Sequence, residues 1–396
     1  MANTFNLGNG NWAQKTEKLL AYNAENDNYK PLPFDFDRAS TATRVNRDGL
    51  IETVATDEPR IDFTDNTKGH LLLEPSRTNL ATYSEDFSGS SWIKSGVGGG
   101  STPIVTSNNA ISPDGTQNAD KIDLDLNGST GSSDWSWVYV NKTSTGSDET
   151  FSIYLKAATN NDIGKVIRVG YISYLDVTLT SDWKRVELTQ SASSATYSYG
   201  FRLRGSENTS DTASFYVWGA QLEEGSYATS YIPTSGSAET RSGETLVQDN
   251  MLTSLFNRQG MAFYLEVESL ANDSATKALT INDGSATDRF VLQLTGNRIS
   301  TFTISLGTTG FSIAAPNTDT TQTNKVAASF DSSNGYLYIN GTQIDVDTIS
   351  NVIGDDLSKI SFGNHALTNN IFYGKIKDFK IYNTALTPAE LTALTS

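Results

Sequence analysis

The chain has 396 residues, no cysteine and a formal net charge of -16 at pH 7, and 19% of its residues are charged. At roughly 150 residues per domain this length predicts two or three domains. The acidic balance argues against binding to a nucleic-acid backbone, and the lack of cysteine excludes disulfides and thiolate metal sites. No apolar run approaches the roughly 18 residues of a membrane-spanning helix, and the abundant Gly, Ser, Thr and Asn predict an all-β protein rich in turns.

The first predicted element is a helix over residues 11–26. Trp12, Leu19 and Leu20 lie on one stripe of it at three- and four-residue spacing. A helix of about 16 residues is marginal by itself and needs a surface to pack on. Two interpretations stay open: the stripe packs on the protein's own first domain, or it anchors the chain to another protein or to a second copy.

Residues 1–80 are predicted to be an attachment region in which short strands follow this helix. Asn46-Arg47-Asp48-Gly49 is typical of a hairpin turn. Strand candidates around it are Leu50–Glu52, Arg60–Phe63 and His70–Leu73.

Residues 81–235 are predicted to form a first β-sandwich of about eight strands, because short alternating runs recur between Gly, Ser, Asn and Asp turns. In the strand predicted over Thr150–Ala157, Phe151, Ile153 and Leu155 share one face. Its last strand is predicted over Phe215–Trp218, followed by a Glu-Glu-Gly turn.

Trp135, Trp137 and Tyr139 alternate along another predicted strand and therefore share one of its faces. If they are exposed, their rings form a platform on which the C–H groups of a sugar can stack. If they are buried, they belong to a core or to an interface. Both interpretations stay open at this point.

Residues 236–250 are polar, and their composition predicts a linker. The alternative is a strand that one domain contributes to the next. Residues 251–396 are predicted to be a second sandwich, with hairpin turns at Asp283-Gly284 and Asn340-Gly341. A short closing helix follows, for which Thr387 is the N-cap, Pro388 the first residue and Glu390 the other half of a capping box.

Several strings resemble virion proteins of tailed bacteriophages. RASTATRVNRDGLIE, EPRIDF and GHLLLEPSRTNL resemble an N-terminal pattern of tail-fibre and head-fibre proteins. WGAQLEEGSYATSYIPT resembles the closing signature of a carbohydrate-binding-module-like jelly roll that follows this pattern. The resemblance covers roughly residues 34–240 and implies a structural protein of the virion.

The second sandwich resembles a different family. YLYINGTQI and FYGKIKDFKIYNTALTPAELTAL are similar to a hairpin, the last strand and the closing helix of concanavalin-A-like, laminin-G-like jelly rolls. That fold carries lectins, glycan hydrolases and spacers, so the resemblance implies a fold more than an activity.

The sequence does not favour an enzyme. Retaining glycosidases place two carboxylates about 5 Å apart, and on this fold their pattern is E-x-D-x-x-E. The chain offers Glu266-Val267-Glu268 without the third acid, a pattern that a solvated strand face also explains. His70 and His365 are the only histidines, and both fall in β-like segments, which disfavours a Ser-His-Asp set.

No cofactor is expected. Asp345-Val346-Asp347 and Asp355-Asp356 could hold Ca²⁺ through their oxygens, although exposed turn carboxylates are the commoner explanation of such pairs.

Together these observations predict an all-β chain of two jelly-roll sandwiches in tandem, after a short N-terminal helix and a β-rich attachment region. The resemblance implies a non-enzymatic protein assembled in the host cytoplasm and carried on the virion as a head or tail fibre. It is expected to bind host-surface or environmental glycans through Trp135, Trp137 and Tyr139. Other virion proteins would bind its N-terminal region through Trp12, Leu19 and Leu20. A homotrimer is expected by analogy with fibres. The alternative is a capsid decoration or tail component that makes only protein contacts.

Overall fold

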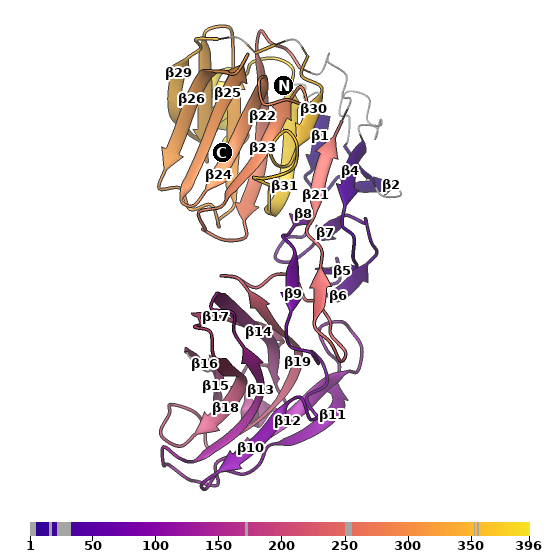
Figure 1. The fold of residues 1–396 in the computed structure, drawn as a ribbon, viewed down its shortest axis with the longest axis vertical. Helices are drawn as coiled ribbons and strands as arrows, with labels where there is room; N and C mark the ends of the chain where they lie inside the picture. The colour runs from indigo at the N-terminus through magenta and orange to yellow at the C-terminus, as the bar shows by residue number, and fades with distance from the viewer. Residues whose placement is uncertain are drawn as a thin grey trace. The chain divides into compact units, whose positions relative to one another are not determined.

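The structure is a computed structural model that describes residues 5–15, 18–21, 33–170, 173–249, 256–351, 353–354 and 356–396 (Figure 1). Within these residues nearly all regular structure is β-strand, and the strands form sheets packed as sandwiches, so the predicted all-β class is confirmed. The exceptions are a 3-10 turn, η1 (Asn160–Asp162), and a helix, α1 (Pro388–Thr395). Both halves of the predicted capping box of α1 are present, between Thr387 and Glu390. The described part of the chain contains no helix with the length and hydropathy needed to cross a bilayer.

The chain folds into two compact units. Unit 1 comprises residues 1–47, 54–75 and 242–396, and unit 2 comprises residues 48–53 and 76–241. Most of unit 2 is therefore an insertion within the sequence of unit 1. The strands that precede the insertion belong with those that follow it.

The first sheet of unit 1 joins strands from both parts of its sequence. In Figure 1 the indigo β1 (Phe5–Gly8) lies beside the yellow β31 (Gly374–Tyr382). One edge of β31 pairs with β22 (Met261–Ser269), and the other edge pairs with β8 (His70–Leu73) and β1. In order across the sheet the strands are β29 (Thr342–Thr348), β28 (Asn334–Ile339), β27 (Asn324–Phe330), β22 (Met261–Ser269), β31 (Gly374–Tyr382), β8 (His70–Leu73) and β7 (Arg60–Asp62), with β1 (Phe5–Gly8) also paired to β31.

The second sheet of unit 1 lies across the core from the first. In order its strands are β2 (Ala13–Lys15), β3 (Lys18–Leu20), β4 (Pro33–Asp37), β21 (Thr245–Gln248), β30 (Lys359–Ser361), β23 (Thr276–Asn282), β24 (Arg289–Thr295), β25 (Arg298–Ser305) and β26 (Thr308–Pro316). The predicted Asn46–Gly49 turn falls between β5 (Ala42–Val45) and β6 (Ile51–Val54). The predicted Asn340-Gly341 turn joins β28 to β29, and both residues have the positive φ, 48° and 79°, that this tight turn requires.

The predicted helix over residues 11–26 is wrong wherever the structure describes it. Residues 13–15 and 18–20 are the antiparallel strands β2 and β3, while residues 16–17 and 22–26 lie outside the described residues. β3 also pairs with β4, so the main chain here extends a sheet. Pairing with an existing sheet and burial of Leu19 override the helical spacing of the apolar residues, because local propensity is weak against tertiary contacts.

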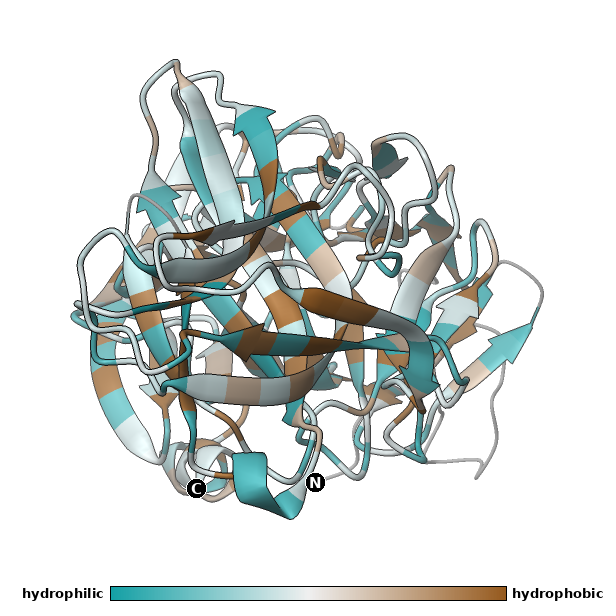
Figure 2. Ribbon diagram, turned by 90° about the horizontal axis from the view of Figure 1, so that it is seen from below, coloured by the Kyte–Doolittle hydropathy of each residue, from teal (hydrophilic) through white to brown (hydrophobic). Residues whose placement is uncertain are grey.

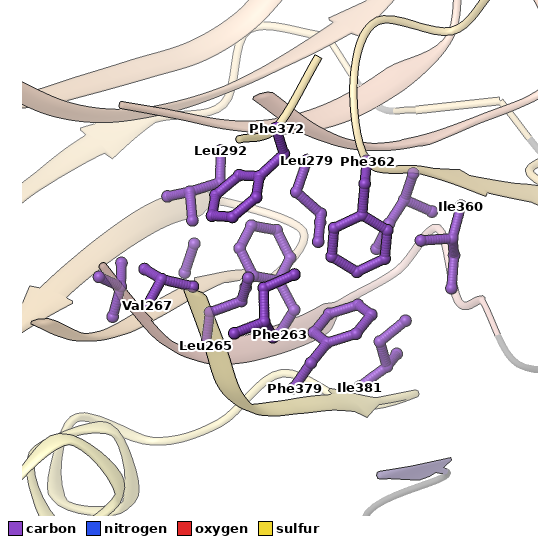
Figure 3. Packing of buried hydrophobic residues seen from close by; sticks show 14 of the residues in the cluster. Phe263, Leu265, Val267, Leu279, Leu292, Ile360, Phe362, Phe372, Phe379 and Ile381 are labelled. Atoms are coloured by element: carbon purple, nitrogen blue, oxygen red, sulfur yellow. The ribbon is translucent and has the colours of Figure 1, made fainter. Parts of the chain in front are cut away.

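The core of unit 1 is filled by alternate residues of its strands. Figure 3 shows Phe263, Leu265 and Val267 of β22 packed among Phe362, Phe372 and Phe379. Residues that precede the insertion share this core and are buried with it: Leu7, Leu19, Phe34, Phe36, Ile61, Leu71 and Leu73. The predicted attachment region thus supplies apolar side chains to the same core as the C-terminal strands.

Four buried charged residues, the buried ion cluster of Arg38, Arg60, Glu74 and Glu244, connect the two parts of unit 1's sequence. Glu244 accepts hydrogen bonds from Arg38 Nη1 at 2.9 Å and from Arg60 Nε at 2.8 Å. Arg60 Nη1 also lies 2.8 Å from Glu74 Oε2, and the Glu74 N–H donates to Glu244 Oε2 at 2.8 Å. All four side chains are almost completely buried.

Unit 2 is a sandwich of two five-stranded antiparallel sheets. Figure 2 shows many strands of the chain banded teal and brown. In unit 2 alternate residues face water and the core. One sheet runs β10 (Ile93–Val97), β13 (Trp135–Thr143), β18 (Thr196–Arg204), β15 (Val166–Gly170), β16 (Tyr174–Thr178). The other runs β11 (Ile104–Ala110), β12 (Ala119–Asp125), β19 (Thr212–Glu224), β14 (Asp148–Ala157), β17 (Lys184–Ser191), and a separate pair is formed by β9 (Arg77–Asn79) and β20 (Glu239–Arg241).

The WGAQLEEG signature has a structural explanation. Gln221 and Glu223 are fully buried although they are polar. Gln221 Oε1 accepts from the Ile232 N–H at 2.6 Å, and Glu223 Oε2 accepts from the Thr229 N–H at 2.9 Å. These side chains therefore hold the exit tail, residues 225–234, against β19. The predicted strand at residues 215–218 is part of that longer strand.

Candidate functional site: an aromatic–arginine face

Trp135, Trp137 and Tyr139 lie on one face of β13, the outer face of its sheet. Their side chains are half-buried, while the intervening Ser136 and Val138 are fully buried. The rings of Trp137 and Tyr139 are stacked, with centroids 4.0 Å apart and an angle of 29° between their planes. The alternation expected from the sequence is therefore present, and all three rings are partly accessible.

Arginines of the neighbouring strand lie beside these rings. Trp135 is opposite Arg204 in the β13–β18 register, and Trp137 is opposite Arg202. The guanidinium of Arg204 is 5.7 Å from the centroid of Trp135, and that of Arg202 is 5.6 Å from the centroid of Trp137. Both distances are within the range of cation–π attraction.

The same face continues across β15 and β16. Arg168 is opposite Arg202 on one side and Asp176 on the other, and it binds Asp176 through two hydrogen bonds of 2.7 and 3.1 Å. The ring of Tyr174, 41% exposed, lies 4.4 Å from the guanidinium of Arg202 and 5.2 Å from that of Arg168.

One carboxylate, Glu207, sits among the three arginines. Its Oε1 is 2.6 Å from Arg202, 3.3 Å from Arg168 and 3.4 Å from Arg204. The hydrogen bond to Asp176, with attraction from Glu207, raises the pKa of Arg168. The aromatic–arginine face is defined by these residues: Trp135, Trp137, Tyr139, Arg168, Tyr174, Asp176, Arg202, Arg204 and Glu207.

This arrangement combines ring surfaces with fixed hydrogen-bonding groups. Because Trp137 and Tyr139 stack on each other, Trp135, Tyr174 and the outer side of Tyr139 offer the remaining ring surface. Guanidinium N–H groups and the Asp176 carboxylate supply donors and an acceptor on the same face of the sheet. A polar ligand with one apolar ring face can satisfy both kinds of group.

An open cleft of about 340 Å³ adjoins the face between the edge strands β16 and β17. Asp176 contributes to both the face and the cleft, and Val177 and Val186 contribute buried apolar side chains to the lining. The volume lies within the range of small-ligand pockets, about 300–1,000 Å³.

Three aromatic residues of this face were predicted from the sequence, but the arginines were not. The period of two along β13 identified Trp135, Trp137 and Tyr139. Arg202 and Arg204 carry the same signal, two residues apart in β18, but nothing local shows that this strand lies beside β13.

The carboxylates considered for catalysis are engaged by lysines. Glu268 Oε1 is 2.6 Å from Lys375 Nζ, and its Oε2 is 3.7 Å from Lys377 Nζ. Glu266 lies opposite Asp378 of β31. On its other side Glu266 lies opposite Lys325 of β27. The two lysines on Glu268 favour its interpretation as part of a solvated strand face.

The two histidines lie in different settings. His70 is in β8 and 1% exposed, whereas His365 lies in a turn between β30 and β31, not in the β-like segment expected from the sequence. No group of three or more His, Cys, Asp or Glu side chains that could hold a metal ion occurs among the described residues. Asp345 and Asp347 instead accept backbone N–H bonds, and Asp355 lies outside the described residues.

Unit 1 is expected to lose stability as the pH falls below 6.5, because of His70. Burial lowers the pKa of His70 from 6.5 to about 4, an effect that Asp62 partly offsets. As the pH falls, His70 of the unfolded chain binds a proton before His70 of the folded chain does. The contribution of neutral His70 to stability is therefore fully present above pH 6.5 and is lost as the pH falls toward 4. Urea unfolding at pH 7 and pH 4 should differ by roughly 3 kcal/mol from this group.

His70→Gln is the matched variant for that pH series. The amide does not titrate, so the variant should show a smaller loss of stability between the two pH values. A loss as large as in the unchanged protein would mean that other groups cause it.

The predicted anchor residues are placed within unit 1. Leu19 is fully buried in its core and Leu20 is half-buried. Trp12 packs against the same core, and its indole N–H donates to Lys68 O at 2.9 Å. Leu19 is therefore not accessible to another protein in this fold, and a docking role for this region would have to use the exposed parts of Trp12 and Leu20.

Fold and site together define a class: an all-β chain of two sandwich units, one carrying an exposed aromatic–arginine face. Residues 241–392, all within unit 1 except the first, match the model of the concanavalin A-like lectin/glucanases superfamily. The match covers a little over a third of the chain. No curated protein matches the chain.

Solved structures that match part of the chain include two sugar-bound modules. The CBM40 module of the Ruminococcus gnavus IT-sialidase, bound to α2,3-sialyllactose, is 16% identical over 36% of this chain and 86% of its own, with a TM-score of 0.32. Domain 4 of AbnA, an extracellular arabinanase from Geobacillus stearothermophilus, in complex with arabinotriose, is 18% identical over 39% and 73%, with a TM-score of 0.32. The receptor-binding domain of a botulinum neurotoxin C/D mosaic is 17% identical over 39% and 40%, with a TM-score of 0.31. TM-scores this low say nothing about what this chain binds.

Proposed function

We propose that the chain is a non-catalytic protein of a tailed-phage particle, a component of a head or tail fibre, that binds host-surface or environmental glycans. The aromatic–arginine face carries the proposal, because it offers partly exposed rings and fixed polar groups on one side of a sheet. Two observations support it. Residues 34–240 resemble virion proteins, and residues 241–392 match a superfamily that includes lectins.

A sugar would bind with the C–H face of its ring on Trp135 or Tyr139 and its hydroxyl groups on Arg204 and Asp176. A single site of this kind is weak, and several copies in one fibre would raise the apparent affinity by simultaneous binding. A homotrimer, expected by analogy with fibres, would supply three faces, and light scattering of the purified chain measures its oligomeric state.

Trp135→Ala is expected to reduce glycan binding by about tenfold or more, as the loss of a central aromatic residue does in other interfaces. The purified full chain would be tested on intact host cells and on a glycan panel, with a melting curve to establish that the variant is folded. Trp183→Ala is the matched control, since Trp183 is another partly exposed tryptophan of unit 2 and its indole N–H donates to Ile111 O. Equal binding by all three proteins would remove this face from the proposal.

The second candidate is a structural role in which the same face contacts another protein of the particle. Trp, Tyr and Arg are the residues most enriched at protein-interface hot spots, and the face is made largely of them. Failure of a multivalent form to bind any glycan or host cell, combined with loss of incorporation into particles on Trp135→Ala, would favour this role.

A further inference from the structure

We propose that the aromatic–arginine face selects sugars that carry an anionic group, a carboxylate or a sulfate. This inference rests on the proposed glycan binding and names the class of ligand. Its basis is the distribution of charge within unit 2 and the geometry around Arg204.

Charged residues are unevenly distributed within unit 2. The unit has 12 lysines and arginines against 20 aspartates and glutamates, so it is acidic as a whole. Three of its six arginines nevertheless gather on this face. Counting Glu207 and Asp176, the face keeps one net positive charge, the reverse of its surroundings.

The three arginines differ in how strongly carboxylates of the protein already bind them. Arg168 binds Asp176 twice, and Arg202 binds Glu207 through Nε at 3.1 Å and Nη2 at 2.6 Å. Arg204 approaches Glu207 only at 3.4 Å, and its Nε donates to Ser132 O at 2.7 Å. Its side chain is also the most exposed of the three, at 30% against 19% for Arg168 and 6% for Arg202. Arg204 is therefore the arginine best placed to receive an anion from solution.

Arg204 also lies beside the ring of Trp135. A guanidinium binds carboxylate and sulfate oxygens through paired N–H groups, and such charge-assisted bonds are stronger than neutral ones. A sugar stacked on Trp135 would place an acidic substituent within reach of Arg204. Stacking and ion pairing would then act on one sugar ring, which favours an acidic sugar over its neutral counterpart.

Polyanions without a stackable sugar face are a poorer fit. The net charge of -16 repels a long nucleic-acid backbone, which gains most of its affinity from many phosphate contacts. Here one arginine is available next to one ring, so the expected ligand carries an isolated acidic group on each sugar.

The test is an array of matched pairs, measured with the full chain. Oligosaccharides of polygalacturonate, alginate and hyaluronan would be compared with their carboxyl-reduced forms, and chondroitin sulfate with chondroitin. We expect each preferred acidic oligosaccharide to bind about tenfold more tightly than its neutral form, the effect of one charge-assisted contact. The two kinds of pair separate a carboxylate from a sulfate requirement.

Arg204→Gln should abolish this preference, because it weakens binding of the acidic forms more than binding of the neutral forms, whereas Arg204→Lys should restore part of it. Asp176→Asn should increase affinity for the acidic forms, because it releases Arg168 and adds net positive charge. The matched control is Lys121→Gln, since Lys121 is also 30% exposed and paired with an aspartate, but lies on the other sheet of unit 2.

The outcomes separate the two proposals. Equal binding of acidic and neutral forms, unchanged by Arg204→Gln, would overturn the anionic preference and leave glycan binding intact. If no oligosaccharide of the array and no host glycan binds, the proposed function fails and this inference fails with it.

Discussion

Glu244→Gln is expected to destabilise unit 1 by about 3–5 kcal/mol, the range measured when one partner of a buried ion pair is removed. Glu244 is fully buried and is the shared acceptor of Arg38, Arg60 and the Glu74 N–H. Burial lowers the pKa of Arg60, but attraction to Glu244 and Glu74 outweighs this and the pKa is raised overall. Arg60 therefore stays charged in the variant, with a neutral amide in place of its main counter-ion.

Calorimetry of the full chain would measure this effect as a downward shift of the transition that belongs to unit 1. The matched control is Glu239→Gln, because Glu239 lies in the same stretch of chain but is exposed, and its side chain accepts a hydrogen bond from Ser237. A shift no larger than that of the control would mean that the buried ion cluster contributes little to the stability of unit 1.

Residues 242–396 produced by themselves are expected not to form a cooperative fold, although they contain nearly all of the superfamily match. β31 would lose β1 and β8 from one edge, and β21 would lose β4. The core would also lose seven large buried apolar side chains that precede the insertion, together with Ala21. Burial of each of the seven contributes about 1.5–3 kcal/mol, so the sum of about 10–20 kcal/mol matches or exceeds the usual stability margin of about 5–15 kcal/mol.

The comparison is a chain in which Asn-Gly replaces residues 76–241 between Pro75 and Ser242. The Glu244 N–H already donates to Glu74 O at 3.1 Å, so the two ends are close enough for a tight turn. This chain should melt in one sharp transition, whereas residues 242–396 should show little cooperative unfolding by circular dichroism. A sharp transition for residues 242–396 would show that the earlier strands are dispensable.

The features predicted correctly from the sequence are local ones. The alternation at Trp135, Trp137 and Tyr139, the Asn340-Gly341 turn and the capping box at Thr387 each depend on residues within a few positions of one another. Such patterns reflect backbone geometry that the sequence specifies directly.

The features that were missed depend on which strands become neighbours. Arg204 joins Trp135 only through the β13–β18 register, across a long interval of sequence. The apolar spacing of Trp12, Leu19 and Leu20 suits a helix, but β4 offers a sheet edge that the hairpin of β2 and β3 extends. Glu244 likewise gives no local sign that Arg38 and Arg60 contact it, because these two arginines lie 206 and 184 positions away in the sequence.

The paired strands β9 and β20 place the two ends of residues 76–241, the larger part of unit 2, next to each other. The chain enters this segment through β9 and leaves through the adjacent β20, so one continuous stretch of sequence holds all of the aromatic–arginine face. Under the proposed function, exchange of this segment for another would change the ligand that the chain binds. The sheets and the buried ion cluster of unit 1 would keep their own residues.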